Sequence, residues 1–191
     1  VSDWAVYKKS LISLFVYFFT SKIVFICLPF LIANFSFGMA EAILPVYANE
    51  RGGAEQYGMF ILAITLGNLT GSVLVVKVMK FPLGLLMMIL PLLSFILWFS
   101  SVIISNNWIS TVSLGLALIP FGMMSILLIT FLQTSIEEAL LARVSSIIDS
   151  VLVSAMPLGA IIGGVFTPVI GVNYMMMISS FGLVGIAFYF F

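Results

Sequence analysis

Six long apolar stretches, almost free of charged residues, follow one another from residue 22 to residue 191. Each is near or above the ~20 residues that an α-helix needs to cross the hydrocarbon core of a bilayer. The pattern predicts an all-α membrane protein with six transmembrane helices, at residues 22–47, 57–78, 82–104, 108–133, 144–170 and 172–191. Because this number is even, both ends of the chain are expected on the same side of the membrane.

Residues 1–20 form a separate element in front of the first span. Aromatic and aliphatic residues recur there close to helical spacing, at Trp4, Tyr7, Leu11, Phe15 and Phe18, with Lys8 and Lys9 between them. This pattern is typical of an amphipathic helix that lies in the membrane interface, here as a cytoplasmic connector. The alternative is that Leu11–Ile32 is the first span, which would place Lys22 near the costly bilayer centre.

The basic residues indicate the orientation of the six spans. With both ends on one side, that side carries Lys8, Lys9, Lys22, Lys77, Lys80 and Arg143, whereas the other side carries Arg51. Cytoplasmic loops of membrane proteins are enriched in lysine and arginine. We therefore expect both termini in the cytoplasm.

The overall composition narrows the function classes. The chain is 63% hydrophobic and 7% charged, far below the roughly 25% charged residues of a soluble domain. Its net charge of zero favours no nucleic-acid partner. Histidine is absent and Cys27 is the single cysteine, which excludes a Ser-His-Asp triad and a histidine-ligated zinc. We expect no enzyme activity, no metal and no cofactor.

Glu41 is the strongest candidate for a functional residue. It lies in the outward half of the first span, on the same helical face as Asn34 and Pro45. A carboxylate inside a membrane is costly unless it faces a cavity, has a partner or is protonated. Glu41 and Asn34 are therefore candidates for proton coupling or for the substrate pathway. Alternatively, Glu41 reaches the outer interface, which is about two turns away.

Three further polar residues in or at the ends of spans are weaker candidates for the pathway. Asn68 and Gln133 are uncharged, and hydrogen bonds between helices are their alternative use. Asp149 lies near the cytoplasmic end of the fifth span. A local charge network with Arg143 and the pair Glu137–Glu138 is its alternative role.

Glycines at fourfold spacing predict close helix packing in two spans. The second span contains Gly67 and Gly71, and the fifth contains Gly159 and Gly163 with Gly164 beside them. Small residues allow membrane helices to approach closely, because lipid gives little hydrophobic driving force for association.

Several short motifs resemble, in order, those of one transporter family. They are Ala42–Tyr47, Gly52–Gly58, Leu66–Ser72 with the basic turn Lys77–Lys80, Gln133–Glu138 with Ala142–Ser146, and Pro157–Gly164. Together they resemble the carboxyl-terminal half of a major facilitator superfamily transporter, in the branch of drug, macrolide and siderophore exporters. In this resemblance, Lys77, Lys80, Glu138 and Arg143 belong to cytoplasmic loop motifs. Two departures are the missing acid near Val75–Val76 and Ala142 in place of a usual glycine.

The resemblance implies half of a major-facilitator fold and a secondary active, proton-coupled exporter of hydrophobic small molecules in the bacterial cytoplasmic membrane. Such transporters bind substrate between two six-helix halves. The implied partners are the lipid bilayer, protons, the substrate, and either a missing amino-terminal half or a second copy. The sequence would then be a fragment of a longer chain or work with another one.

The alternative function is a non-transporting membrane subunit or an immunity-type interaction protein. The two functions differ in whether Glu41 faces a water-filled cavity or lipid and headgroups.

Overall fold

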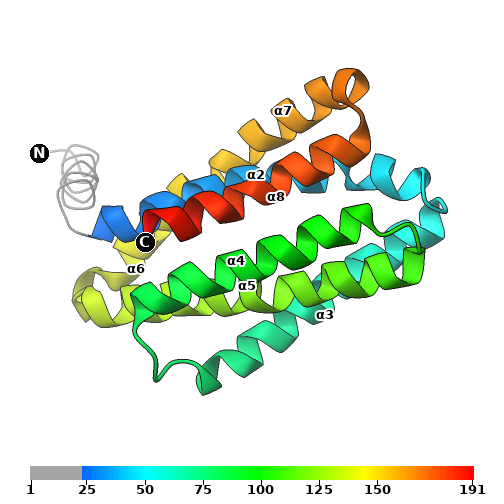
Figure 1. Ribbon diagram of the computed structural model, residues 1–191. Coiled ribbons are helices and arrows are strands. Elements are labelled where there is room, and N and C mark those ends of the chain that lie inside the picture. The colour runs from blue at the N-terminus through cyan, green and yellow to red at the C-terminus, as the bar shows by residue number, and fades with distance from the viewer. Residues whose placement is uncertain (1–22) are drawn as a thin grey trace, which may run out of the picture.

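The computed structural model describes residues 23–191, and this part of the chain is helical without strands (Figure 1). Its elements are α2 (Ile23–Asn49), α3 (Ala54–Leu74), the 3-10 turn η1 (Val75–Lys77), α4 (Leu83–Ile103), α5 (Asn107–Ser135), α6 (Glu138–Val153), α7 (Ala155–Ile170) and α8 (Val172–Tyr189). The predicted interfacial helix at residues 1–20 lies outside the described residues, as does most of the alternative first span.

Within residues 23–191, the prediction of six helices that are long and apolar enough to cross a membrane is confirmed. They are Val24–Asn49, Ala54–Lys77, Leu83–Ile103, Asn107–Ser135, Leu140–Ile170 and Val172–Tyr189. Large apolar side chains cover the outer surface of the bundle; Val169 and Val73, for example, are 82% and 73% exposed. Such a continuous apolar exterior is what a lipid-facing surface requires.

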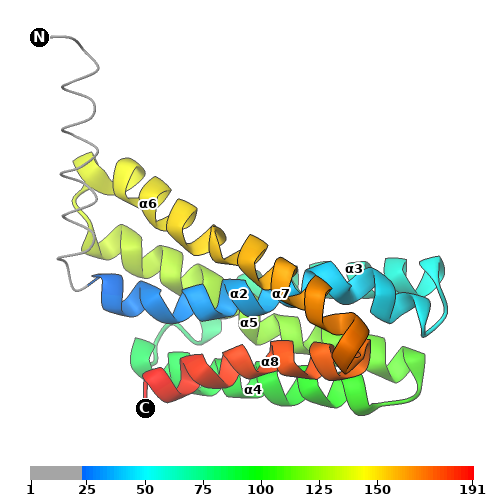
Figure 2. The same cartoon turned by 90° about the horizontal axis from the view of Figure 1, so that it is seen from above.

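The fifth span is divided into two helices. α6 begins at Glu138, upstream of the predicted start at residue 144, because the segment between is rich in good helix formers such as Leu140 and Ala142. It ends at Val153, and α7 begins at Ala155. Pro157 cannot donate to the carbonyl of Val153, and its ring clashes with that carbonyl, which explains the break. Figure 2 shows α6 diverging from the bundle while α7 lies along it.

Apart from α6, the described helices form two sets of three with the same pattern of neighbours. α2 packs against α7 and α8, just as α5 packs against α3 and α4. The two sets meet mainly through one helix of each, because α4 packs against α8. Successive spans alternate in direction, so α2 and α5 are antiparallel and the two sets are related by inversion (Figures 1 and 2). The central helices α2 and α5 make only a few contacts with each other.

Glycines allow both tight pairs to form. In the pair of α2 and α7, an added Cβ on Gly159 would overlap the carbonyl oxygen of Phe35, and one on Gly163 would lie 2.9 Å from that of Met39. In the pair of α3 and α5, Cβ atoms on Gly67 and Gly71 would overlap carbonyl oxygens of α5, those of Gly115 and Ile119. These positions have no room for a side chain.

Gly164 differs from its neighbour Gly163. It is exposed, and an added Cβ there would meet nothing within 4 Å among the described residues. Gly164 therefore takes no part in the contact between α7 and α2.

Serine hydroxyls hold α4 against α5. Ser94 donates to the carbonyl oxygen of Ala117 at 2.6 Å, Ser113 to that of Leu97 at 2.9 Å and Ser110 to that of Ser101 at 2.7 Å. All of these hydroxyls are buried. Hydrogen bonds between helices stabilise membrane bundles in this way.

Candidate functional site

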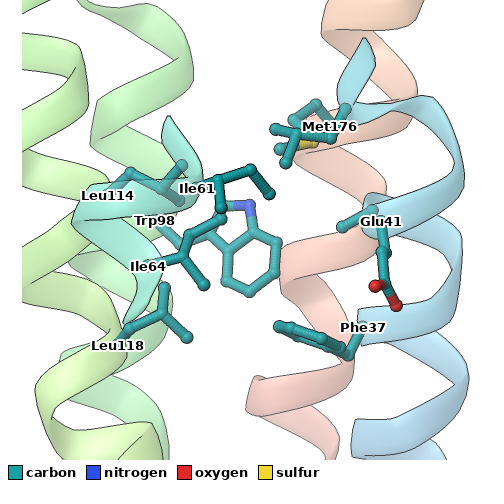
Figure 3. Close-up of a pocket in the computed structure, with 10 residues that line it drawn as sticks. Phe37, Glu41, Ile61, Ile64, Trp98, Leu114, Leu118 and Met176 are labelled. Carbon is teal, nitrogen blue, oxygen red and sulfur yellow. The ribbon is translucent and has the colours of Figure 1, made fainter. Parts of the chain in front are cut away.

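A pocket lies between the two sets of helices, where α2 and α5 do not close on each other. Its volume is about 70 Å³. Its lining comes from five helices: Phe37, Ala40, Glu41 and Leu44 of α2, Ile61 and Ile64 of α3, Trp98 of α4, Leu114 and Leu118 of α5, and Met176 of α8. Figure 3 shows these side chains around the space. The pocket is thus built from segments that are far apart in the sequence.

Glu41 is the one charged residue that lines this pocket, among the residues described. Three other residues of the same helix line the pocket: Ala40 directly before Glu41, Phe37 one turn before it and Leu44 one turn after it. The side chain of Glu41 is exposed, so the carboxylate is accessible from outside the bundle. A single accessible carboxylate at an apolar pocket can take up and release a proton or contact a substrate.

Trp98 forms a wall of the pocket. Its side chain is 4% exposed, and its ring meets that of Phe37 edge to face, with centroids 6.5 Å apart. Phe37 in turn stacks on Phe121, with centroids 5.5 Å apart. Sequence reasoning missed Trp98 and Phe121, because an aromatic residue in the middle of a span carries no local signal that separates a pocket wall from ordinary packing.

The two predicted asparagines do not join Glu41. Asn34 is half-buried and donates to the carbonyl oxygen of Phe30 in its own helix, at 2.9 Å. Asn68 likewise donates to Ile64 of its own helix, at 3.2 Å, and not to another helix. Within the described chain, neither asparagine lines the pocket. Both amide groups therefore satisfy backbone carbonyls locally.

The remaining candidates lie away from the pocket. Gln133, near the end of α5, and Asp149, on α6, are exposed. The four residues of the cytoplasmic loop motifs, Lys77, Lys80, Glu138 and Arg143, are exposed as well. None of these six described residues lines the pocket, so only Glu41 of the predicted pathway residues does.

Arg51 has a role that the sequence did not indicate. It follows α2 and donates to the carbonyl oxygens of Val102, at 2.7 Å, and Ile104, at 2.9 Å, at the end of α4. It also donates to the hydroxyl of Ser110 at 3.2 Å, and its guanidinium lies 4.5 Å from the ring centroid of Tyr47. The last carbonyls of a helix lack helical partners and attract cations. Arg51 therefore ties together the ends of α2, α4 and α5.

The described residues 23–191 contain no cluster of His, Cys, Asp or Glu side chains that could hold a metal ion. Comparisons of the chain with protein-family models and with curated proteins found no match. The resemblance to major facilitator transporters therefore stays a hypothesis that rests on the sequence motifs.

Proposed function

We propose that this chain is one six-helix half of a secondary active transporter that exports hydrophobic small molecules in exchange for protons. The observation that carries the proposal is the pocket between two inverted sets of three helices. In many transporters, inverted repeats enclose the substrate site at their interface. The pocket lies between the two sets of this bundle with Glu41 at its edge, and we take it to serve as such a site.

The lining of the pocket supports a hydrophobic substrate. Nine of the ten lining residues are apolar, including two large aromatic rings, Phe37 and Trp98. Ligand pockets for apolar molecules combine such walls with very few polar groups. The tenth lining residue, Glu41, supplies the group through which proton movement would be coupled to transport.

The second wall of the pathway would come from another six-helix unit. In a major-facilitator arrangement, two halves rock against each other around the substrate. The partner would be an amino-terminal half or a second copy, covering the face on which Glu41 is exposed. The membrane would be the bacterial cytoplasmic membrane, with both termini in the cytoplasm.

The test is efflux from cells that express the complete reading frame of the protein. The probes are the hydrophobic dyes rhodamine 6G and Hoechst 33342, with efflux measured at several external pH values. We expect pH-dependent efflux by the wild type and its loss in Glu41→Gln, because glutamine mimics the protonated carboxyl group. Dye binding by the variant should persist, since the apolar lining is unchanged.

Glu50→Gln is the matched control. Glu50 is exposed and follows α2, outside the pocket, so this variant should pump like the wild type. Normal pH-dependent efflux by Glu41→Gln would refute the coupling role of Glu41. If the wild type moves neither dye and dissipates no proton gradient, the protein is better described as a non-transporting membrane subunit.

A further inference from the structure

The pocket contains a buried hydrogen-bond donor without an acceptor. The Nε1–H of Trp98 has no partner among residues 23–191, although the side chain is 4% exposed. A buried polar group that is not hydrogen-bonded destabilises a structure, and nearly all such groups in proteins have partners. The exception at Trp98 lies in the wall of a cavity, which suggests that something in the cavity is the partner.

The rest of the pocket indicates what kind of partner fits. Figure 3 shows the indole nitrogen on the side of Ile61 and Met176, whereas the Glu41 carboxylate lies across the pocket on the side of Phe37. A water molecule in a protein interior needs two to four polar neighbours. The side chains of Ile61 and Leu114 offer none, and Met176 offers only a weakly accepting sulfur, so water is held poorly beside the nitrogen.

We propose that this pocket binds the end of a nonpolar molecule through one neutral hydrogen-bond acceptor, a carbonyl or ether oxygen, which receives the Nε1–H of Trp98. The apolar part of the bound end fills the space among the aliphatic side chains of α3, α5 and α8. The carboxylate of Glu41 on the same pocket disfavours an anionic group, which leaves neutral or cationic molecules.

The size of the pocket sets how much of a ligand enters. A cavity of about 70 Å³ is smaller than the ~300–1,000 Å³ typical of drug-sized ligands. The pocket would therefore hold one ring or a short branched end of a larger molecule. That this molecule is the exported substrate rests on the proposed function, whereas binding itself does not.

Two probes of the same shape test the hydrogen bond without any change to the pocket. Cyclohexanone has an acceptor oxygen where methylenecyclohexane has a CH₂ group. The complete protein is placed in lipid nanodiscs, with Trp4→Phe and Trp108→Phe substitutions that leave Trp98 as the single tryptophan. Binding is followed by tryptophan emission and thermal stability, at equal probe concentrations in the membrane.

We expect saturable binding of cyclohexanone with a red shift of Trp98 emission, and about tenfold weaker binding of methylenecyclohexane, as one hydrogen bond implies. Equal affinity for the two probes, or no saturable binding of either, would overturn the proposal. Equal affinity would mean that the Nε1–H of Trp98 does not bond the ligand. The absence of saturable binding would mean that the pocket is not a ligand site.

The variant Trp98→Phe keeps an aromatic wall and removes the donor. In a protein with the native Trp4 and Trp108, measured by thermal stability, it should reduce cyclohexanone affinity to that of methylenecyclohexane. Trp108→Phe is the matched control, because Trp108 is 67% exposed. Unchanged preference for cyclohexanone in a folded Trp98→Phe protein would also overturn the proposal.

The outcomes for the pocket and for transport are independent. Selective cyclohexanone binding without dye efflux would support the pocket and refute the transporter. Proton-coupled dye efflux together with equal binding of the two probes would support the transporter and refute the proposed hydrogen bond in the pocket.

Discussion

Replacing Arg51 with methionine should destabilise the outer end of the bundle. The variant loses the bonds to the carbonyl oxygens of Val102 and Ile104 and leaves them without donors. Charge-assisted hydrogen bonds of this kind contribute about 1–3 kcal/mol each to stability. We expect a lower midpoint of thermal unfolding for the detergent-solubilised protein, with dye binding retained.

Lys77→Met is the matched control. Lys77 is exposed, and its replacement removes the same charge at another place in the chain. The unfolding midpoint of Arg51→Lys should lie between those of Arg51→Met and Lys77→Met. One ammonium group cannot bond two carbonyl oxygens with the geometry of the guanidinium fork. Equal unfolding midpoints for Arg51→Met and Lys77→Met would show that the Arg51 contacts contribute nothing measurable.

Individual residues were predictable only where their chemistry conflicts with the membrane. Glu41 stands out because a carboxylate in an apolar span is costly, and it does line the pocket. Trp98 and Met176 suit the membrane as well as any apolar residue, so the sequence could not separate them from packing residues. The sequence shows that Arg51 is charged, but it does not show its hydrogen-bond acceptors, which lie at the end of α4 and in α5, far from Arg51 in the sequence.

At the scale of helices, the two neighbouring glycines of α7 give a sharp test of the packing. Gly163→Leu places a side chain against Met39 of α2, where an added Cβ already lies 2.9 Å from a carbonyl oxygen. Overpacking should cost about 1–3 kcal/mol or more. We expect less folded protein and a lower unfolding midpoint.

Gly164→Leu is the internal control, because a Cβ there would meet nothing within 4 Å in the described chain. It should express and unfold like the wild type, since glycine and leucine differ little in this exposed position beyond helix propensity. The packing of α7 on α2 would be refuted if the two leucine variants behaved alike.

The helices themselves follow from sequence, but their pairing does not. Hydropathy alone predicts six spans, because a bilayer demands long apolar helices with satisfied backbones. The pair Gly159 and Gly163 predicts that one face of the fifth span packs closely against another helix, but it does not indicate which helix that is. That this helix is α2 depends on backbone geometry around Phe35 and Met39, which no local pattern encodes.

For the molecule as a whole, the orientation in the membrane is the property to test. We predict that the turn at Lys77–Lys80 and the segment at residues 137–143 face the cytoplasm, and that the turn containing Asn106 faces outward. A cysteine at Asn106 should react with a membrane-impermeant maleimide added to intact cells, and one at Lys80 should react only after lysis. The native Cys27 is 1% exposed and gives little background. The reverse labelling pattern would refute the orientation.

The pairing of α2 with α7 and α8 also governs how the protein is made. α3, α4 and α5 are synthesised consecutively and complete one set of contacts among themselves, whereas α2 gains its largest contacts only after α7 and α8 have followed. During that interval the glycine-containing face of α2 around Gly38 meets only lipid or an insertion chaperone. Ribosome stalling in the codons of α6 or α7 should therefore leave this face of α2 without its partner helix and open to membrane proteases, although the α3–α4–α5 set can already form.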